Sequence, residues 1–376
     1  MENSENKTFP DLIAEACVYA VGDRYQIIFH TKRKGAAYVR IGEDTFYDAM
    51  GGCVHTEKKV HAITVPMALL DREKSYTIGY FHVALRKAYE FDCEEKQEKT
   101  YAFRPVQAGA PVRCVMLADA HGALERPAAM ASSCGQVDVV IMNGDVPNRC
   151  EEADDLLHIP LLAAMASHGE VPVLNARGNH DTRGACAPDY ALHVGTKNGS
   201  HYYTCRLGDV FFILLDCGED KPDNHKEYGG LADYEQYRRA QIAFLDRVLE
   251  CDDIDECSHV AVIVHTNPRI HYDREVCAEW LSRLSAIKPD VMLCAHTHNC
   301  EVAMPTNEAK DGYPPITFPT VTGSAPRGVK GTTDAGKPPS FTGALIVFDE
   351  GGTDAYFIDD QGTEHGHYHF DGRTAE

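Results

Sequence analysis

From residue 114 onward, short apolar runs alternate with longer segments whose apolar residues recur at helical spacing. The runs CVML, VVIM, VPVL, VAVIV and VMLC are four or five residues long, and polar residues or glycine soon follow each one. Runs of this length are typical of fully buried strands. Buried strands that alternate with helices form βαβ units, in which the strands pair in parallel and helices cover the sheet. The pattern therefore predicts an α/β fold in this part of the chain.

Every one of these five runs ends in side chains that can bind a metal ion. Because the functional crevice of an open α/β sheet lies at the carboxyl ends of its strands, all five endings are expected to meet at one edge. In chain order, the candidate ligands are Asp119, His121, Asp145, Asn179, His265, His296 and His298.

The chemistry of this set indicates the metal. Carboxylate, amide and imidazole groups without thiolate suit Mn, Fe or Zn better than Cu(I) or an iron-sulfur cluster. Seven ligands are too many for one catalytic ion that keeps an open position, but they suit two ions about 3.5 to 4 Å apart. Such a pair lowers the pKa of a bound water and neutralises the oxygens of a phosphoryl group. A dinuclear site for phosphoester chemistry is the prediction.

The order and spacing of these residues resemble the calcineurin-like metallophosphoesterases. The resemblance rests on D-x-H at 119–121, G-D at 144–145, G-N-H-D at 178–181, the histidine of VHTNP at 265 and H-x-H at 296–298. It implies hydrolysis by a metal-bound hydroxide. The implied ligand sets are Asp119, His121 and His298 for one ion, and Asn179, His265 and His296 for the other, with Asp145 as the bridge.

Three further residues beside Asn179 are candidates for catalysis. The resemblance implies that His180 protonates or stabilises the leaving oxygen. Protein phosphatases of this superfamily orient that histidine with an aspartate where this chain has Asn148, so Asp181 is the substitute to consider. Arg183 could bind a phosphate through its planar fork of donors, with a structural ion pair as the alternative. Arg177, which precedes the turn, is interpreted as structural.

Before the linker at residues 104–113, the chain shows strand-like alternation broken by turns. Short strands at regular spacing predict an antiparallel β-sandwich of the immunoglobulin or fibronectin III type over residues 1–108. Residues 109–376 are predicted to form a four-layer phosphoesterase domain, a β-sandwich flanked by helices, so the fold class is mixed α/β. This layout resembles purple acid phosphatases. Their tyrosine ligand is replaced by Asn148, so no Fe(III)-tyrosinate centre is expected.

Charge and composition exclude several classes of partner. The net charge of -21 argues against non-specific binding to nucleic acid or to an anionic membrane. No signal peptide and no apolar run long enough to span a bilayer is found, so a soluble cytoplasmic protein is expected. The 14 cysteines include no C-x-x-C pair, which favours reduced thiols. The oligomeric state stays open.

Hydrolysis of a small-molecule phosphate monoester is therefore the predicted function. One alternative is a phosphodiesterase that acts on a nucleotide or a phospholipid head group, because the same ion pair serves both reactions. An alternative of another class is a degenerate phosphoesterase fold that serves as a binding scaffold. Near the C-terminus, EHGHYHF places three histidines on one strand face, which predicts a polar strand edge or a further metal site.

Overall fold

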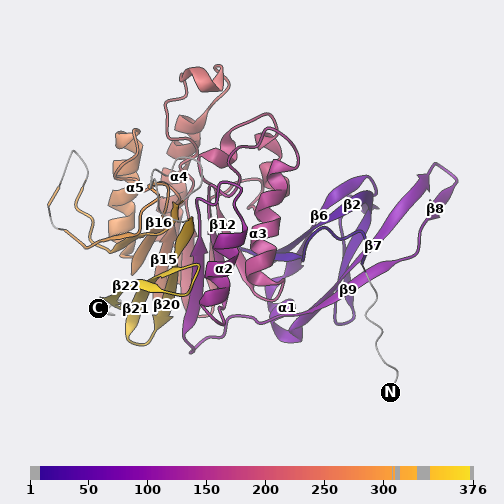
Figure 1. The fold of residues 1–376 in the computed structure, drawn as a ribbon, viewed down its shortest axis with the longest axis horizontal. Coiled ribbons are helices and arrows are strands. Elements are labelled where there is room, and N and C mark those ends of the chain that lie inside the picture. The colour runs from indigo at the N-terminus through magenta and orange to yellow at the C-terminus, as the bar shows by residue number, and fades with distance from the viewer. Residues whose placement is uncertain (1–8, 307, 310–313, 328–338, 373–376) are drawn as a thin grey trace.

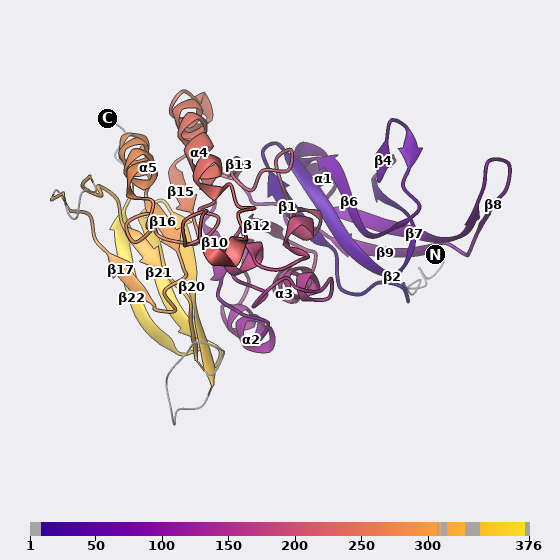
Figure 2. The ribbon, with the colours of Figure 1, turned by 90° about the horizontal axis from the view of Figure 1, so that it is seen from above.

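The computed structural model describes residues 9–306, 308–309, 314–327 and 339–372. Two β-sheets pack face to face, and helices cover their outer faces (Figures 1 and 2). Figure 2 shows α4 and α5 on one side of the sheets and α2 and α3 on the other. The four layers confirm the predicted mixed α/β phosphoesterase fold.

The first sheet contains three parallel strands at its centre. Its strands run in the order β22 (Glu364–Asp371), β21 (Gly352–Asp359), β20 (Ser340–Asp349), β10 (Val112–Leu117), β11 (Val139–Asn143) and β12 (Pro172–Ala176). The short β19 (Ala325–Arg327) pairs with β20. Strands β10, β11 and β12 are parallel to one another, so their carboxyl ends share one edge.

The second sheet also has parallel strands at its centre, namely β14, β15, β16 and β18. Its order is β13 (Tyr203–Leu207), β14 (Val210–Leu214), β15 (His259–Ile263), β16 (Val291–Cys294), β18 (Thr320–Thr322) and β17 (Glu301–Ala303). Alternate residues of β14 pack on opposite sides. Phe212 and Leu214 join the core between the sheets, whereas Phe211 and Ile213 pack in the cluster that includes Trp280 of α5. This period of two explains why a continuous apolar run is needed for a strand buried on both faces.

The helices join consecutive strands. They are α2 (Glu125–Ser133), α3 (His158–Ser167), α4 (Tyr234–Leu249) and α5 (Arg274–Ile287). Shorter 3-10 helices span Asp155–Leu157, His180–Thr182, Ala187–Leu192, Lys226–Tyr228 and Asp252–Ile254. In helix α5, Val276, Trp280 and Leu284 repeat at helical spacing and are buried. Among the described residues, no helix is long and apolar enough to cross a membrane.

The N-terminal strands are organised around one long strand, β2. They are β1 (Cys17–Val21), β2 (Arg24–Ile41), β3 (Asp44–Tyr47), β4 (Ala49–Met50), β5 (Cys53–Val54), β6 (Lys58–Pro66), β7 (Ser75–Arg86), β8 (Phe91–Cys93) and β9 (Gln97–Ala102). The first half of β2 pairs with β1 and β6, and its second half pairs with β3 and β7. A register shift between His30 and Gly35 separates the two halves.

The N-terminal strands continue the first phosphoesterase sheet. Strand β1 pairs in parallel with β12, so one sheet runs from the C-terminal hairpins into the N-terminal part. The division of the chain near residue 108 stays a prediction. The alternating pattern of residues 59–69 predicts a strand, but helix α1 (Met67–Glu73) begins within this segment. Pro66 explains the change, because proline lacks the N–H that a continuing strand would need.

Candidate metal centre

The predicted ligands lie in loops that directly follow five parallel strands. Asp119 and His121 follow β10, Asp145 follows β11, and Asn179 follows β12; the remaining three follow β15 and β16. Six of the seven predicted ligands, together with His180, form three groups in which the donor atoms all lie within 4.8 Å of one another. The groups are Asp119, His121 and His298; His121, Asp145 and His180; and Asp145, His265 and His296.

Short distances join the donors within each group. Nε2 of His121 lies 3.0 Å from Nε2 of His298, which lies 3.5 Å from Oδ1 of Asp119. In the group of Asp145, His265 and His296, Nε2 of His265 lies 3.3 Å from Oδ2 of Asp145. Asp145 belongs to two of the three groups. Its role as a bridge stays a prediction.

Contacts with the backbone aim these side chains. The Nδ1 atom of His265 donates to the carbonyl of Asn143 at 2.6 Å, so its Nε2 faces the carboxylates. Oδ1 of Asp145 accepts a hydrogen bond from the backbone N–H of His180 at 2.8 Å. Oδ2 of Asp119 accepts from the backbone N–H of His296 at 3.2 Å. Each carboxylate therefore has one anchored oxygen and one oxygen that faces the site.

Backbone strain is concentrated in the same residues. Nine described residues other than glycine have a positive φ. Three of them, Lys74, His168 and Lys288, end helices, and Asn198 lies in a turn. The other five are predicted ligands, namely Asp119, His121, Asp145, His296 and His298. Non-glycine residues seldom adopt this conformation, and it clusters at functional sites, where surrounding structure enforces it.

The charges of the site fit a bound cation. Burial lowers the pKa of His121 to about 4, so its imidazole is neutral at neutral pH and can bind a metal ion. Burial also opposes charge on His265, but Asp145 and Asp119 outweigh burial and raise its pKa to about 10. The buried carboxylates thus require positive charge beside them, and a metal ion can supply it in place of the proton on His265.

Unpartnered polar atoms support the same conclusion. Oδ1 of Asp119 and Nδ1 of His121 are buried and have no hydrogen-bond partner. Oδ1 of Asn179 lies 3.0 Å from Nδ1 of His296. If the amide is turned over, its oxygen instead accepts from Arg183 at 2.9 Å. A cation would favour the first orientation, because the amide oxygen is the group that binds metal. The donors present therefore fit divalent metal binding.

The ring of His180 is oriented by a main-chain oxygen. Its Nδ1 atom donates to the carbonyl of Asn148 at 2.7 Å, and its Nε2 atom lies 3.3 Å from Nη1 of Arg183. Asp181 therefore does not replace the missing aspartate as hypothesised. Instead, its fully buried carboxylate accepts from the backbone N–H groups of Gly178 (2.7 Å) and Asp145 (3.1 Å). Burial, together with the charge of Asp145, raises the pKa of Asp181 to about 7. Asp181 positions the loops that carry the ligands.

The two arginines near this turn have different partners. Arg177 forms a buried ion pair with Asp216 at 2.8 Å, in agreement with its structural interpretation. Arg183 contacts Glu219 through two nitrogens, at 2.6 and 2.8 Å, and Asp220 at 2.9 Å. Sequence reasoning did not select Glu219 or Asp220, although both closely follow the end of β14. Their position in CGED, at the carboxyl end of a parallel strand, was the available signal.

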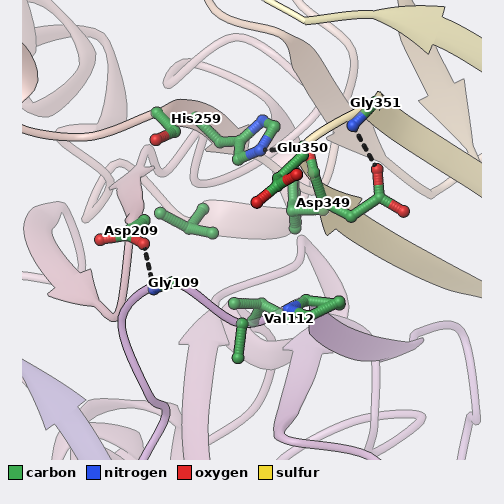
Figure 3. Close-up of a pocket in the computed structure, with 12 residues that line it drawn as sticks. Gly109, Val112, Asp209, His259, Asp349, Glu350 and Gly351 are labelled. Atoms are coloured by element: carbon green, nitrogen blue, oxygen red, sulfur yellow. Dashed lines mark hydrogen bonds between the residues drawn. The ribbon is translucent and has the colours of Figure 1, made fainter.

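Other polar clusters lie away from this edge. A pocket of about 470 Å³ lies at the opposite ends of the strands and is lined by Val112, Asp209, His259 and their neighbours (Figure 3). On β22, His365 contacts Asp359, whereas His367 and His369 contact Asp354. Within the described part of the chain, β22 contributes to none of the metal-binding groups. These histidines thus form the expected polar strand edge.

Fold and site together define a phosphoesterase with a metal centre at the strand ends. The family model for calcineurin-like phosphoesterases matches residues 112–300, and the chain belongs to this family.

Solved structures share this fold. Purple acid phosphatase PPD1 from seeds of yellow lupin (Lupinus luteus) aligns with a TM-score of 0.60 and 12% identity, over 94% of this chain and 73% of that one. PhoD aligns with a TM-score of 0.53 and 11% identity, over 97% of this chain and 94% of that one. No curated protein sequence matches the chain. At these identities, the structural similarity concerns the fold alone.

Proposed function

We propose that this protein hydrolyses small-molecule phosphate monoesters with two divalent ions of Mn, Fe or Zn. One observation carries the proposal: two groups of donor atoms lie side by side, and Asp145 is within reach of both. Asp119, His121 and His298 would hold one ion, and Asn179, His265 and His296 the other. When bound, the ions would activate water and neutralise the charge of the phosphoryl oxygens.

The residues beside the centre supply positioning and a proton. The Asn148 carbonyl holds Nδ1 of His180, so Nε2 is the nitrogen available to the substrate. In its doubly protonated form, His180 can donate the Nε2 proton to the leaving oxygen. Asp181 binds the backbones of Gly178 and Asp145 and keeps their loops together below the ligands. Arg183 brings a second set of N–H donors to the same place.

Phosphodiester hydrolysis is a second candidate, and the surroundings of Arg183 favour it. Its guanidinium is paired with two carboxylates, those of Glu219 and Asp220. It therefore offers less net positive charge to the second negative charge of a monoester. Rates on p-nitrophenyl phosphate and on its bis ester distinguish the candidates. A strong preference for the bis ester would replace the monoesterase proposal with a diesterase.

A binding scaffold without activity is the alternative of another class. Degenerate enzymes lose ligands, but this chain has all seven predicted ligands, and the structure brings their loops to one edge. The proposal therefore treats the centre as catalytic.

The test of the proposal is Asp145→Asn. We expect this change to abolish turnover of p-nitrophenyl phosphate and to reduce the bound metal measured on the same preparation, because Asp145 shares one donor group with His121 and another with His265 and His296. Asp246→Asn, a change at an exposed ion pair with Arg283, is the matched control and should retain both. Full activity of the Asp145→Asn protein would contradict the proposal.

A further inference from the structure

We propose that Glu219 is a positioning residue that fixes Arg183 so that Nη1 of Arg183 and Nε2 of His180 bind the same leaving-group oxygen. The inference rests on the proposed phosphoester hydrolysis and adds a named interaction to it. Glu219 lies just beyond the end of β14, in the second sheet, whereas His180 and Arg183 follow β12 of the first sheet. The contact thus joins the two halves of the site.

Glu219 is buried, and its carboxylate is fully engaged. Only 1% of the residue is exposed. Oε1 accepts from Nε of Arg183 at 2.6 Å and from Oγ1 of Thr182 at 3.1 Å, while Oε2 accepts from Nη2 of Arg183 at 2.8 Å. Burial of a carboxylate is costly unless it is paired, and the two parallel bonds fix the plane of the guanidinium as well as its place. Glu219 therefore sets the direction of Arg183.

The backbone of Glu219 is held from the opposite side. Its carbonyl accepts from Nε2 of His271 at 3.0 Å and from Nη1 of the fully buried Arg238 at 3.4 Å. Arg238 also donates to the carbonyl of Cys217 at 2.9 Å and to Asp273 at 2.9 Å. These bonds tie the loop to α4 and to the start of α5. The carboxylate consequently has a rigid base.

Arg183 keeps one amino group directed at the catalytic histidine. Its Nε and Nη2 atoms bind Glu219 and Asp220, whereas Nη1 lies 3.3 Å from Nε2 of His180. The Asn148 carbonyl occupies the other nitrogen of His180. In this structure Nη1 of Arg183 donates to Nε2 of His180, so the two nitrogens face the same place. A substrate oxygen that enters between them replaces this contact and can accept a hydrogen bond from Nη1 and from protonated Nε2.

The step that this geometry serves is departure of the alcohol. Water forms a new P–O bond, and the P–O bond to the leaving oxygen breaks. That oxygen takes the electron pair of the broken bond and the Nε2 proton of His180, while Nη1 of Arg183 donates a hydrogen bond to it. The water releases one proton, which restores His180, so the products are one alcohol and one phosphate. Stabilisation of the leaving oxygen matters most when the departing alkoxide or phenoxide is a strong base.

Glu219→Gln tests the inference, because glutamine keeps the size of the side chain and removes its charge. We compare kcat on phenyl phosphate, whose leaving group is a strong base, with kcat on p-nitrophenyl phosphate, whose leaving group is a weak one. The expected result is a loss of kcat that is at least about tenfold larger for phenyl phosphate, with KM changed less than about twofold.

Two further variants complete the experiment. Arg183→Lys should show the same dependence on the leaving group, and the double variant should lose little more, because the two residues act as one unit. Glu227→Gln, which alters an ion pair of Lys221 in the same loop, is the matched control and should change neither rate. In the metal-free protein, Glu219→Gln should also shift the ring ¹⁵N signals of His180.

The outcomes separate this inference from the proposed function. Equal losses on both substrates, with a lowered melting temperature and unchanged His180 signals, would make Glu219 purely structural and overturn the inference alone. A metal-loaded wild-type protein that cleaves no phosphoester would overturn both proposals. If Glu219→Gln does not fold, the ratio of rates in Arg183→Lys decides in its place.

Discussion

Gly144→Ala should damage the metal centre through one added methyl group. Gly144 precedes Asp145, and its backbone crosses that of Gly178, which precedes Asn179. A Cβ atom at residue 144 would lie 2.5 Å from the nitrogen and 2.6 Å from the Cα of Gly178, and 2.6 Å from Nδ1 of His265. Two of these atoms belong to the backbone, so no flexible side chain can move aside. The new methyl group must displace the loops that carry the ligands.

The size of the effect follows from two terms. Gly144 has a φ of +82°, and an L-residue in that conformation costs about 1 to 2 kcal/mol. Overpacking adds about 1 to 3 kcal/mol. Relief of the contacts requires the loops to separate by about 0.9 Å, and a misplacement near 1 Å lowers the rate about 100-fold. We therefore expect a loss of about 2 to 5 kcal/mol in the free energy of unfolding and of about 100-fold in kcat.

Gly199→Ala is the control that isolates the steric term. Gly199 has the same φ of +82°, but no atom lies within 4 Å of the position of its Cβ. This variant should lose only about 1 to 2 kcal/mol by urea denaturation and keep its metal content and kcat. Assays are p-nitrophenyl phosphate hydrolysis, metal analysis and urea unfolding of both variants. Normal kcat and metal content in Gly144→Ala would refute the argument that the close approach of Gly144 to Gly178 sets the ligand geometry.

Two predictions concern protons and metal. Burial lowers the pKa of His30 to about 3 and of His193 to about 4, and their rings touch at 3.0 Å. Below about pH 6.5, these two histidines are protonated in the unfolded chain but stay neutral in the folded protein. The free energy of unfolding therefore falls as the pH falls, by about 2 kcal/mol for the pair between pH 6.5 and pH 5.5. Urea unfolding of His30→Gln should show a shallower pH slope, and an unchanged slope would contradict this. Removal of metal with EDTA should lower the melting temperature by about 3 °C for each site, if the free metal concentration was about 100 times the Kd of that site. Asp145→Asn should lack this shift, and an equal shift would place the bound metal elsewhere.

Secondary structure was predictable where the pattern of apolar residues was strong. The runs at β10, β11 and β15 were identified because a strand buried on both faces is apolar throughout. Helix α1 was not, because its apolar residues continue directly from β6 and only Pro66 marks the change. The parallel pairing of β1 with β12 was also not predictable, since a strand does not encode which distant edge it joins.

The sequence by itself determined which side chains could form the metal centre. A parallel sheet brings the carboxyl ends of its strands to one edge, so residues such as Asp119, Asp145 and His265 could be grouped from their order alone. Only the tertiary structure decided how neighbouring groups serve that centre. Arg183 pairs with Glu219 across two sheets, and Nδ1 of His180 donates to the Asn148 carbonyl and not to Asp181. Such contacts depend on the direction of each side chain and on angstrom-scale distances between loops, which spacing along one chain does not specify.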